Sequence, residues 1–268
     1  MGCTGVAAQP TATATVPPAQ AAVEATSIPV TATPLPTATE ISATVTAVQT
    51  PAQPSTATAT ALPPTEEVDM SQLNLDLIEA ARQGDLAAVQ NLLEQGASVH
   101  ASDDRGVTAL IAAAYQDHVD VAKVLIEAGA DVNVQDVTQQ SAYLIPTADG
   151  SLEMLKLTLA AGADVHSKDS YNGTGLIRAA DRGHVDIIEE LLKTDIEIDH
   201  VNRLGWTALL EAIILGNGGP RHTETVRLLV EAGADVNLPD GQGVMPITHA
   251  RRRGYTEIVS ILEAAGAR

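Results

Sequence analysis

The chain is poor in cysteine and in aromatic residues. Its 268 residues include one cysteine, one tryptophan and no phenylalanine. Because Cys3 has no possible intrachain partner, a disulfide-stabilised fold is excluded. No segment approaches the roughly 18–20 consecutive apolar residues that a membrane-spanning helix needs, so we expect no such helix.

The sequence also lacks the residue groups that metal binding and catalysis require. It contains no closely spaced set of cysteine, histidine and carboxylate ligands, no glycine-rich nucleotide-binding motif and no activated serine or cysteine. We therefore expect no catalytic residue, no metal and no cofactor, and a protein that is not an enzyme.

Positive charge is scarce. The formal net charge is −19, and no lysine or arginine precedes Arg82. The first 70 residues carry only five charges, all acidic, which leaves −14 for the remainder of the chain. A surface this acidic repels a phosphate backbone, and nucleic acid is therefore not an expected partner. We expect the charge mainly to keep the protein soluble.

Residues 1–70 differ in composition from the rest of the chain. From Thr4 to about Glu66 the sequence consists largely of Thr, Ala, Pro, Val and Gln, with no helical or strand period. So little bulky apolar surface cannot offset chain entropy, and we interpret the segment as a disordered tether. About 60 such residues have a root-mean-square reach of roughly 40–45 Å.

Gly2-Cys3 ahead of this stretch resembles the mature start of bacterial lipoproteins, in which the cysteine carries the lipid. The charged and apolar segments that precede such a cysteine are missing, as they would be if the start codon lay further upstream. Myristoylation of Gly2 is an alternative, although Val6 stands where that motif has Ser or Thr; an ordinary tether cysteine is another. Lipidation of Cys3 predicts a location outside the cytoplasmic membrane; otherwise we expect the cytoplasm.

A 33-residue period runs through the last two thirds of the chain. It is marked by glycine-alanine pairs one period apart: Gly96-Ala97, Gly129-Ala130, Gly162-Ala163, Gly233-Ala234 and Gly266-Ala267. One divergent unit interrupts the series, with Asp195 at the glycine position. A fixed period of this length indicates stacked supersecondary units, each unable to bury its apolar face alone.

One complete unit shows the role of each position. Asp103 and Gly106 mark a turn, Thr108 is placed to cap a first helix, and Gly129 terminates a second helix. The second helix has an apolar face of Val121, Val124 and Leu125. This pattern resembles the ankyrin repeat.

The resemblance covers roughly Leu75 to Arg268 and implies an all-α ankyrin solenoid in residues 71–268, which we expect to be a monomer. We divide it into six units: 75–102, 103–135, 136–168, 169–201, 202–239 and 240–268. By resemblance, the projecting turns, called tips below, and the first helices form a concave face that binds protein partners.

Two units depart from the pattern. In the third, Gln139 replaces the turn glycine and Pro146 falls inside the first helix, where proline costs about 3 kcal/mol, so we expect a short or kinked helix. In the fifth, the five residues 217–221 are extra and are expected to lengthen the turn between the helices. Together with Trp206 and Pro246, this insertion resembles a group of stand-alone bacterial ankyrin proteins.

Apolar and aromatic side chains at the tips are the first candidates for partner binding. Trp206, the sole tryptophan, is expected either to face outward as an interface anchor or to fold back over a neighbouring tip. The remaining candidates on the same face are Arg105, Val107, Tyr115, Tyr171, Arg203 and Leu204.

A second group of candidates lies at the far end of the first helices, where Ile214 and Leu215 are apolar although neighbouring units have charged residues. Two interpretations are open: an anion or acidic-partner site with backbone N–H groups from the insertion, or an insertion that folds over the two apolar residues. The arginines at this end are Arg182, Arg221, Arg252 and Arg253.

Several polar residues recur at equivalent positions and are expected to be structural. Arg178 and Glu211 belong to adjacent units, and we expect them to pair across the stack. Units in such a stack lie about 10 Å apart, too far for recurring histidines to share a metal ion. These histidines, at the start of the second helices, are His118, His184 and His222.

We interpret the chain as a non-enzymatic scaffold that binds a protein partner through the concave face, tethered outside the cytoplasmic membrane. One alternative is an accessory protein that stabilises or shields an enzyme in the same compartment. Another is a secreted, host-directed effector, which would not carry a lipid anchor.

Overall fold

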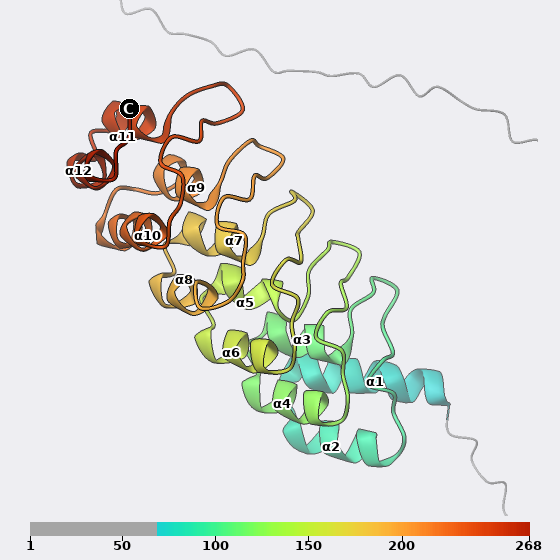
Figure 1. Cartoon of the computed structure of the whole chain (residues 1–268). Coiled ribbons are helices and arrows are strands. Elements are labelled where there is room, and N and C mark those ends of the chain that lie inside the picture. The colour runs from blue at the N-terminus through green and yellow to red at the C-terminus, as the bar shows by residue number, and fades with distance from the viewer. Residues whose placement is uncertain (1–68) are drawn as a thin grey trace, which may run out of the picture. The chain divides into compact units, whose positions relative to one another are not determined.

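The computed structural model describes residues 69–268, so residues 1–68 of the predicted tether, Cys3 among them, lie outside the described residues. Within that range the chain forms twelve α-helices and one isolated β-bridge, which confirms the all-helical fold (Figure 1). The helices are α1 (Met70–Gln83), α2 (Leu86–Glu94), α3 (Ala109–Tyr115), α4 (Val119–Glu127), α5 (Leu144–Asp149), α6 (Leu152–Ala160), α7 (Gly175–Arg182), α8 (Val185–Leu191), α9 (Ala208–Ile214), α10 (Pro220–Glu231), α11 (Pro246–Arg253) and α12 (Thr256–Ala264).

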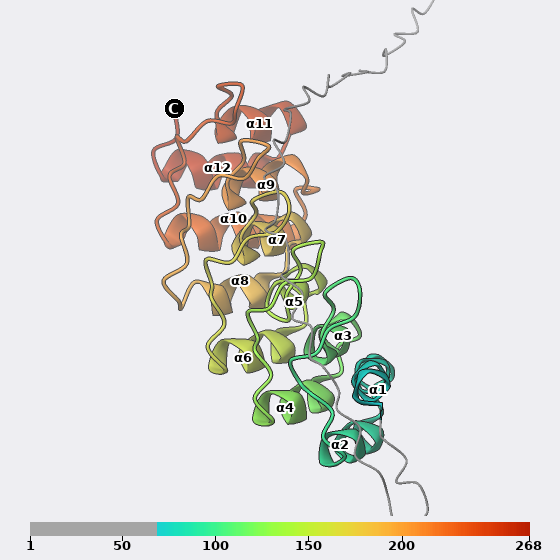
Figure 2. The same ribbon diagram turned by 90° about the vertical axis from the view of Figure 1, so that its right-hand side faces the viewer.

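The helices pair in chain order, and the pairs stack. The odd-numbered helices contact one another in succession from α1 to α11, and the even-numbered helices do so from α2 to α12, which gives two layers. In Figures 1 and 2 the tips project from the same side of the stack, next to the odd-numbered layer. We call the surface formed by the tips and the exposed sides of the odd-numbered helices the tip face.

Small side chains allow the odd-numbered helices to pack closely. Ala113, Ala179, Ala212 and Ala250 are completely buried at corresponding places in the second, fourth, fifth and sixth units. The apolar core forms two clusters that meet inside the third unit, where Leu144 belongs to one and Ile145 to the other. Each unit therefore buries its apolar surface only against its neighbours, as expected for a solenoid.

The predicted helix ends are confirmed where the structure tests them. The hydroxyl of Thr108 accepts a hydrogen bond from the backbone N–H of Ile111 at 3.3 Å, and Thr207 caps α9 in the same way. Gly129 follows α4 with φ of 94°, a conformation that glycine adopts without the steric cost a side chain would add.

The third unit is irregular, as predicted from Gln139 and Pro146. Gln139 adopts φ of 61°, in the left-handed region that glycine occupies in other tips. Helix α5 has six residues and starts at Leu144, so Pro146 lies in its first turn. The N–H of Ile145 donates to the carbonyl of Ser141 at 3.1 Å, so a helical turn already precedes α5. Pro146 has no N–H to donate to the next carbonyl, that of Ala142, and this missing bond leaves α5 short.

The first unit begins earlier than the predicted boundary at Leu75. Helix α1 starts at Met70, and the Asp69 carboxylate caps it by accepting from the backbone N–H of Ser71 at 3.0 Å. Leu73 is 7% exposed and belongs to the core. The first helix of this unit lacks a preceding tip, so no turn signal marked its start.

The insertion of the fifth unit lengthens the turn between the helices, as predicted, and also changes the helix that follows. Helix α10 starts at Pro220, so the last inserted residues lengthen the helix as well as the turn. The loop packs against Tyr255, whose hydroxyl donates to the carbonyl of Gly216 at 2.8 Å and whose ring lies against Gly218. Leu215 remains 52% exposed, so the expected cover over Leu215 does not form.

Candidate functional site

Each of the five tips is closed by the residue that begins it. In the second unit, one carboxylate oxygen of Asp103 accepts hydrogen bonds from the backbone N–H groups of Arg105 and Val107, both at 2.9 Å. The other tips make the equivalent pair of bonds to their first residues, Asp136, Asp169, Asn202 and Asp240. Since side chains close the tips internally, their outward-facing groups are held in fixed positions.

In the fourth, fifth and sixth units, the other polar atom of the first tip residue forms a hydrogen bond with the side chain nine residues further along the chain, on the first helix. Asp169 accepts from Arg178 at 3.1 Å, and Asp240 is hydrogen-bonded to His249 at 2.7 Å. In the fifth unit the chemistry is reversed, because Asn202 donates to Glu211 at 2.6 Å. The predicted pairing of Arg178 with Glu211 across the stack is therefore wrong: each is already bound to the tip of its own unit.

Glu211 is a buried carboxyl group with one unsatisfied oxygen. The residue is 4% exposed, and its Oε2 atom has no hydrogen-bond partner among the described residues. Burial raises the pKa of Glu211 to about 7, the Asn202 bond opposes this, and the negative charges of Asp181 and Asp169 add to it. Sequence spacing could have revealed the pair, because Asn replaces Asp only where the residue nine positions later is acidic.

The second and third units lack this bond within the unit. Ala112 and Ile145 occupy the positions that carry Arg178, Glu211 and His249 elsewhere. Asp136 instead accepts from the hydroxyl of Tyr115, in the preceding unit, at 2.9 Å.

These contacts set the protonation of both groups. Burial acts to raise the pKa of Asp136, but hydrogen bonds from Thr138, Gln140 and Tyr115 outweigh it and hold the pKa below its usual range. Burial and the neighbouring Asp136 carboxylate raise the pKa of the Tyr115 hydroxyl. At neutral pH the pair is therefore a carboxylate accepting from a neutral phenol.

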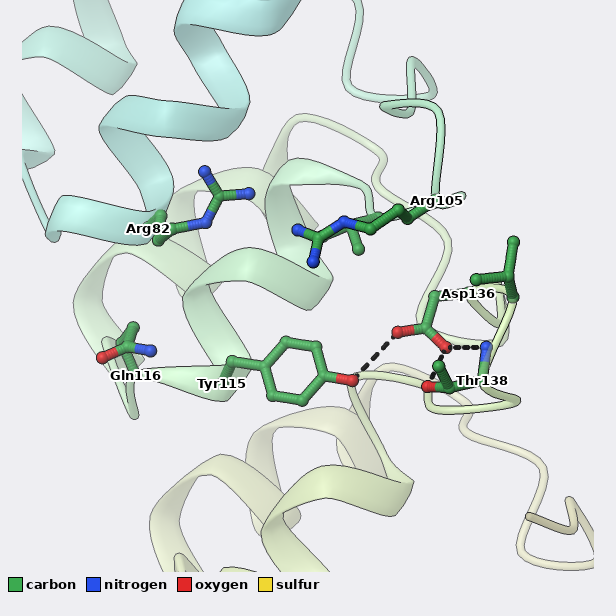
Figure 3. A pocket seen from close by; sticks show the side chains of 8 residues that line it. Arg82, Arg105, Tyr115, Gln116, Asp136 and Thr138 are labelled. Atoms are coloured by element: carbon green, nitrogen blue, oxygen red, sulfur yellow. Dashed lines mark hydrogen bonds between the residues drawn. The ribbon is translucent and has the colours of Figure 1, made fainter. Parts of the chain in front are cut away.

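A hollow of about 290 Å³ lies on the tip face between the tips of the second and third units (Figure 3). Each tip takes the number of its unit. In Figure 3 the guanidinium groups of Arg82 and Arg105 lie on one side and the ring of Tyr115 on the other. The lining residues are Arg82, Arg105, Val107, Tyr115, Gln116, Asp136, Val137 and Thr138. The structure thus brings together three of the predicted site residues (Arg105, Val107 and Tyr115), although Val107 is buried at the base of its tip and not outward-facing.

The remaining lining residues carry no sequence pattern that by itself pointed to a site. Arg82 comes from the first unit, whose helix α1 packs directly on α3. Val137 is 69% exposed at the third tip. Arg82 stands one 33-residue period before Tyr115, which was a visible signal, but the direction of its side chain depends on how α1 packs on α3.

The other predicted tip residues form a separate exposed group along the fourth and fifth tips. Tyr171 and Leu204 are 63% and 51% exposed, and Trp206 is half-buried. Arg203 joins these tips, because its backbone N–H donates to Tyr171 at 2.9 Å and its guanidinium donates to Ser170 at 2.7 Å.

The arginines at the far end of the first helices have different neighbours. Arg182 pairs with Asp181, and Arg253 donates to the carbonyl of Ile214 at 2.7 Å. Arg221 lines a hollow together with three acidic residues, and Arg252 is exposed. This arrangement does not favour the predicted anion site.

The recurring histidines contact the preceding unit. The ring of His184 lies against Gly150 and is hydrogen-bonded to the carbonyl of Ala148 at 3.0 Å, and His222 is bonded to Asp181 in the same way. Within residues 69–268 no cluster of His, Cys, Asp and Glu could hold a metal ion. No helix in the same range is long and apolar enough to cross a bilayer.

Fold and surface together define a repeat solenoid whose distinctive surface features are rigid tips and the hollow between two of them. The chain belongs to the ankyrin repeat family. The family model for three copies of the repeat matches residues 66–136 and 142–240, and the model for many copies matches residues 220–263.

Related proteins share this organisation over most of their length. The ankyrin repeat protein YahD of Escherichia coli K12 is 40% identical over 201 residues, which are 75% of this chain and all of YahD. The ankyrin repeat domain ABAYE2397 of Acinetobacter baumannii AYE is 47% identical, with a TM-score of 0.70 over 72% of this chain and 98% of that one. The human ASB11 ankyrin repeat domain is 30% identical, with a TM-score of 0.62 over 72% and 84% of the two chains.

These similarities confirm the predicted likeness to stand-alone bacterial ankyrin proteins. Ankyrin repeat domains are generally protein-binding scaffolds and are typically not enzymes.

Proposed function

We propose that this protein binds a protein partner through its tip face and carries out no chemistry on it. The observation that carries the proposal is the hollow between two rigid tips, together with the exposed side chains of Tyr171 and Leu204 on the following tips. Exposed aromatic and aliphatic groups on a pre-formed surface bind with little loss of conformational entropy. Family membership supports the same class of function.

Hydrogen exchange on a purified complex tests the proposal. The full-length chain is used to capture partners, which are identified by mass spectrometry, and the complex is then reconstituted. We expect slowed exchange in the tips and in α3, α5, α7 and α9. Protection confined to the even-numbered helices would contradict binding through the tip face.

A matched pair of variants separates the tip face from the far end of the first helices. Tyr171→Ser with Leu204→Ser should weaken the captured complex, whereas Leu215→Ser, which removes a similarly exposed apolar group, should not. If the captured partner is a stoichiometric enzyme whose heat inactivation slows in the complex, the accessory role applies instead.

We further propose that Cys3 carries a lipid that holds the protein at the outer side of the cytoplasmic membrane. The support is the Gly2-Cys3 start followed by a Thr-, Ala- and Pro-rich segment. Expression from the native locus with an alkyne fatty acid should label the wild type but not Cys3→Ser. Unlabelled wild-type protein in the soluble fraction would overturn the anchor and leave the secreted effector open.

A further inference from the structure

The hollow between the second and third tips differs in charge from four other hollows on the described surface. Counting Lys, Arg, Asp and Glu, it is lined by two arginines and one aspartate. Of four others, one has a single arginine with three carboxylates, one a single arginine with two, one only two carboxylates, and one is balanced. In a chain of net charge −19, a hollow with excess positive charge attracts a negatively charged group.

The one lining carboxylate is already saturated. Asp136 accepts from the Tyr115 hydroxyl through one oxygen, and from the hydroxyl and N–H of Thr138 and the N–H of Gln140 through the other. Its negative charge is therefore spread over four donors and is a weak competitor for a guanidinium group.

The two guanidinium groups, in contrast, keep donors available. Arg105 forms an ion pair with Asp103 at 3.6 Å and Arg82 forms one with the same oxygen at 3.9 Å, but both distances are longer than a hydrogen bond. The other oxygen of Asp103 is bound to two backbone N–H groups of its own tip. Arg82 also pairs with Glu79, but through one nitrogen. A guanidinium has five N–H donors, so both groups can bind a further carboxylate.

Val107, Tyr115 and Val137 form an apolar part of the wall, beside the polar Gln116 and Thr138. Val107 is buried, the Tyr115 side chain is 41% exposed, and Val137 is 69% exposed. Pockets for drug-sized ligands span about 300–1,000 Å³, so this hollow is at the lower limit and suits one or two side chains.

We propose that this hollow binds an aspartate or glutamate side chain of the partner protein, next to an aliphatic residue of the same segment. The carboxylate accepts hydrogen bonds from Arg82 and Arg105, and the aliphatic side chain lies against Tyr115 and Val137. The inference rests on the proposed function and specifies the chemistry of its partner.

Selection from a random peptide library on the immobilised full-length chain tests this inference. Enriched peptides should contain Asp or Glu beside Leu, Ile or Val. Synthetic copies of these peptides, amidated at the C-terminus, should bind about tenfold or more tightly than copies with Gln or Asn in place of the acid, as measured by isothermal titration calorimetry. Amidation excludes recognition of a terminal carboxylate.

The double variant Arg82→Gln/Arg105→Gln should lose this preference. Its control, Arg182→Gln/Arg252→Gln, changes the net charge equally at the far end of the first helices and should retain it. Circular dichroism spectra and melting temperatures verify that both variants fold.

Three results would overturn the inference: no enrichment of acidic peptides, enrichment of Lys- or Arg-containing peptides, or acidic peptides that bind the Arg82→Gln/Arg105→Gln variant as well as the wild type. Each leaves partner binding by the tip face standing, because that is measured independently by hydrogen exchange of the captured complex.

Discussion

Replacement of Glu211 by glutamine should stabilise the protein, and the gain should increase with pH. The folded-state pKa of Glu211 is raised to about 7 from an ordinary value of 4.5, chiefly by burial. Between these values the folded protein binds more protons than the unfolded chain, so the free energy of unfolding falls as pH rises through this window. The glutamine side chain of the E211Q variant cannot ionise, yet its oxygen can still accept from Asn202.

The pKa of Glu211 differs by about 2.5 units between the folded and unfolded states, and each unit corresponds to about 1.4 kcal/mol. Full ionisation of Glu211 therefore lowers the free energy of unfolding by about 3 kcal/mol. The same calculation gives about 1 kcal/mol at pH 5.5, so the advantage of E211Q should grow by about 2 kcal/mol between pH 5.5 and 8.5. The lower limit avoids the pI of about 4.5, where the protein would precipitate.

Urea denaturation followed by tryptophan fluorescence measures this difference. Trp206 is the sole tryptophan, and its backbone N–H is bound to Asn202, so it reports the unit that contains Glu211. Glu79→Gln is the matched control: it lies at the equivalent position of the first unit but is exposed, and should show no such gain. A gap between E211Q and wild type that stays constant with pH, or a less stable E211Q, would refute the reasoning.

Three further substitutions test the packing described above. Asn202→Asp places a second carboxylate against Glu211 and should destabilise the protein by about 2 kcal/mol at pH 8, as measured by urea denaturation. Adding Glu211→Arg to this variant recreates the aspartate–arginine bond of the preceding unit and should recover most of the loss. Gly175→Ala should cost about 1–3 kcal/mol because the new methyl group would lie 2.6 Å from the Tyr143 hydroxyl, and a thermal melt should show a smaller loss in a Tyr143→Phe background; an equal loss would contradict this explanation. Tyr255→Phe removes the bond to the inserted loop and should cost about 1 kcal/mol, with faster hydrogen exchange in residues 216–219; unchanged exchange would mean that the loop is held by other contacts.

The repeat and its departures could be predicted from the sequence because they depend on local chemistry. The 33-residue spacing can be read directly from the chain. The effects of the capping Thr108, the terminating Gly129 and Pro146 reach only a few residues along it. Tyr255 shows the limit of this reasoning. It replaces the histidine of other units and reaches the longer loop of the fifth unit, but only the structure reveals that the two features are coupled.

The candidate site was predictable only in part. Arg105, Val107 and Tyr115 were identified because the tip and the end of the first helix can be located from the repeat. Their convergence with Arg82 was not, because it depends on the packing of α1 against α3.

The sequence by itself determined the class of fold, since an apolar pattern with a constant period can be buried only by stacking like units. The tertiary structure alone decided which polar groups meet. Arg178 and Glu211 could pair in a linear alignment of repeats, but each has a nearer partner in its own tip, at 3.1 and 2.6 Å. Periodicity specifies equivalent positions, whereas hydrogen bonding depends on distances of a few ångströms between side chains, and only packing sets those distances.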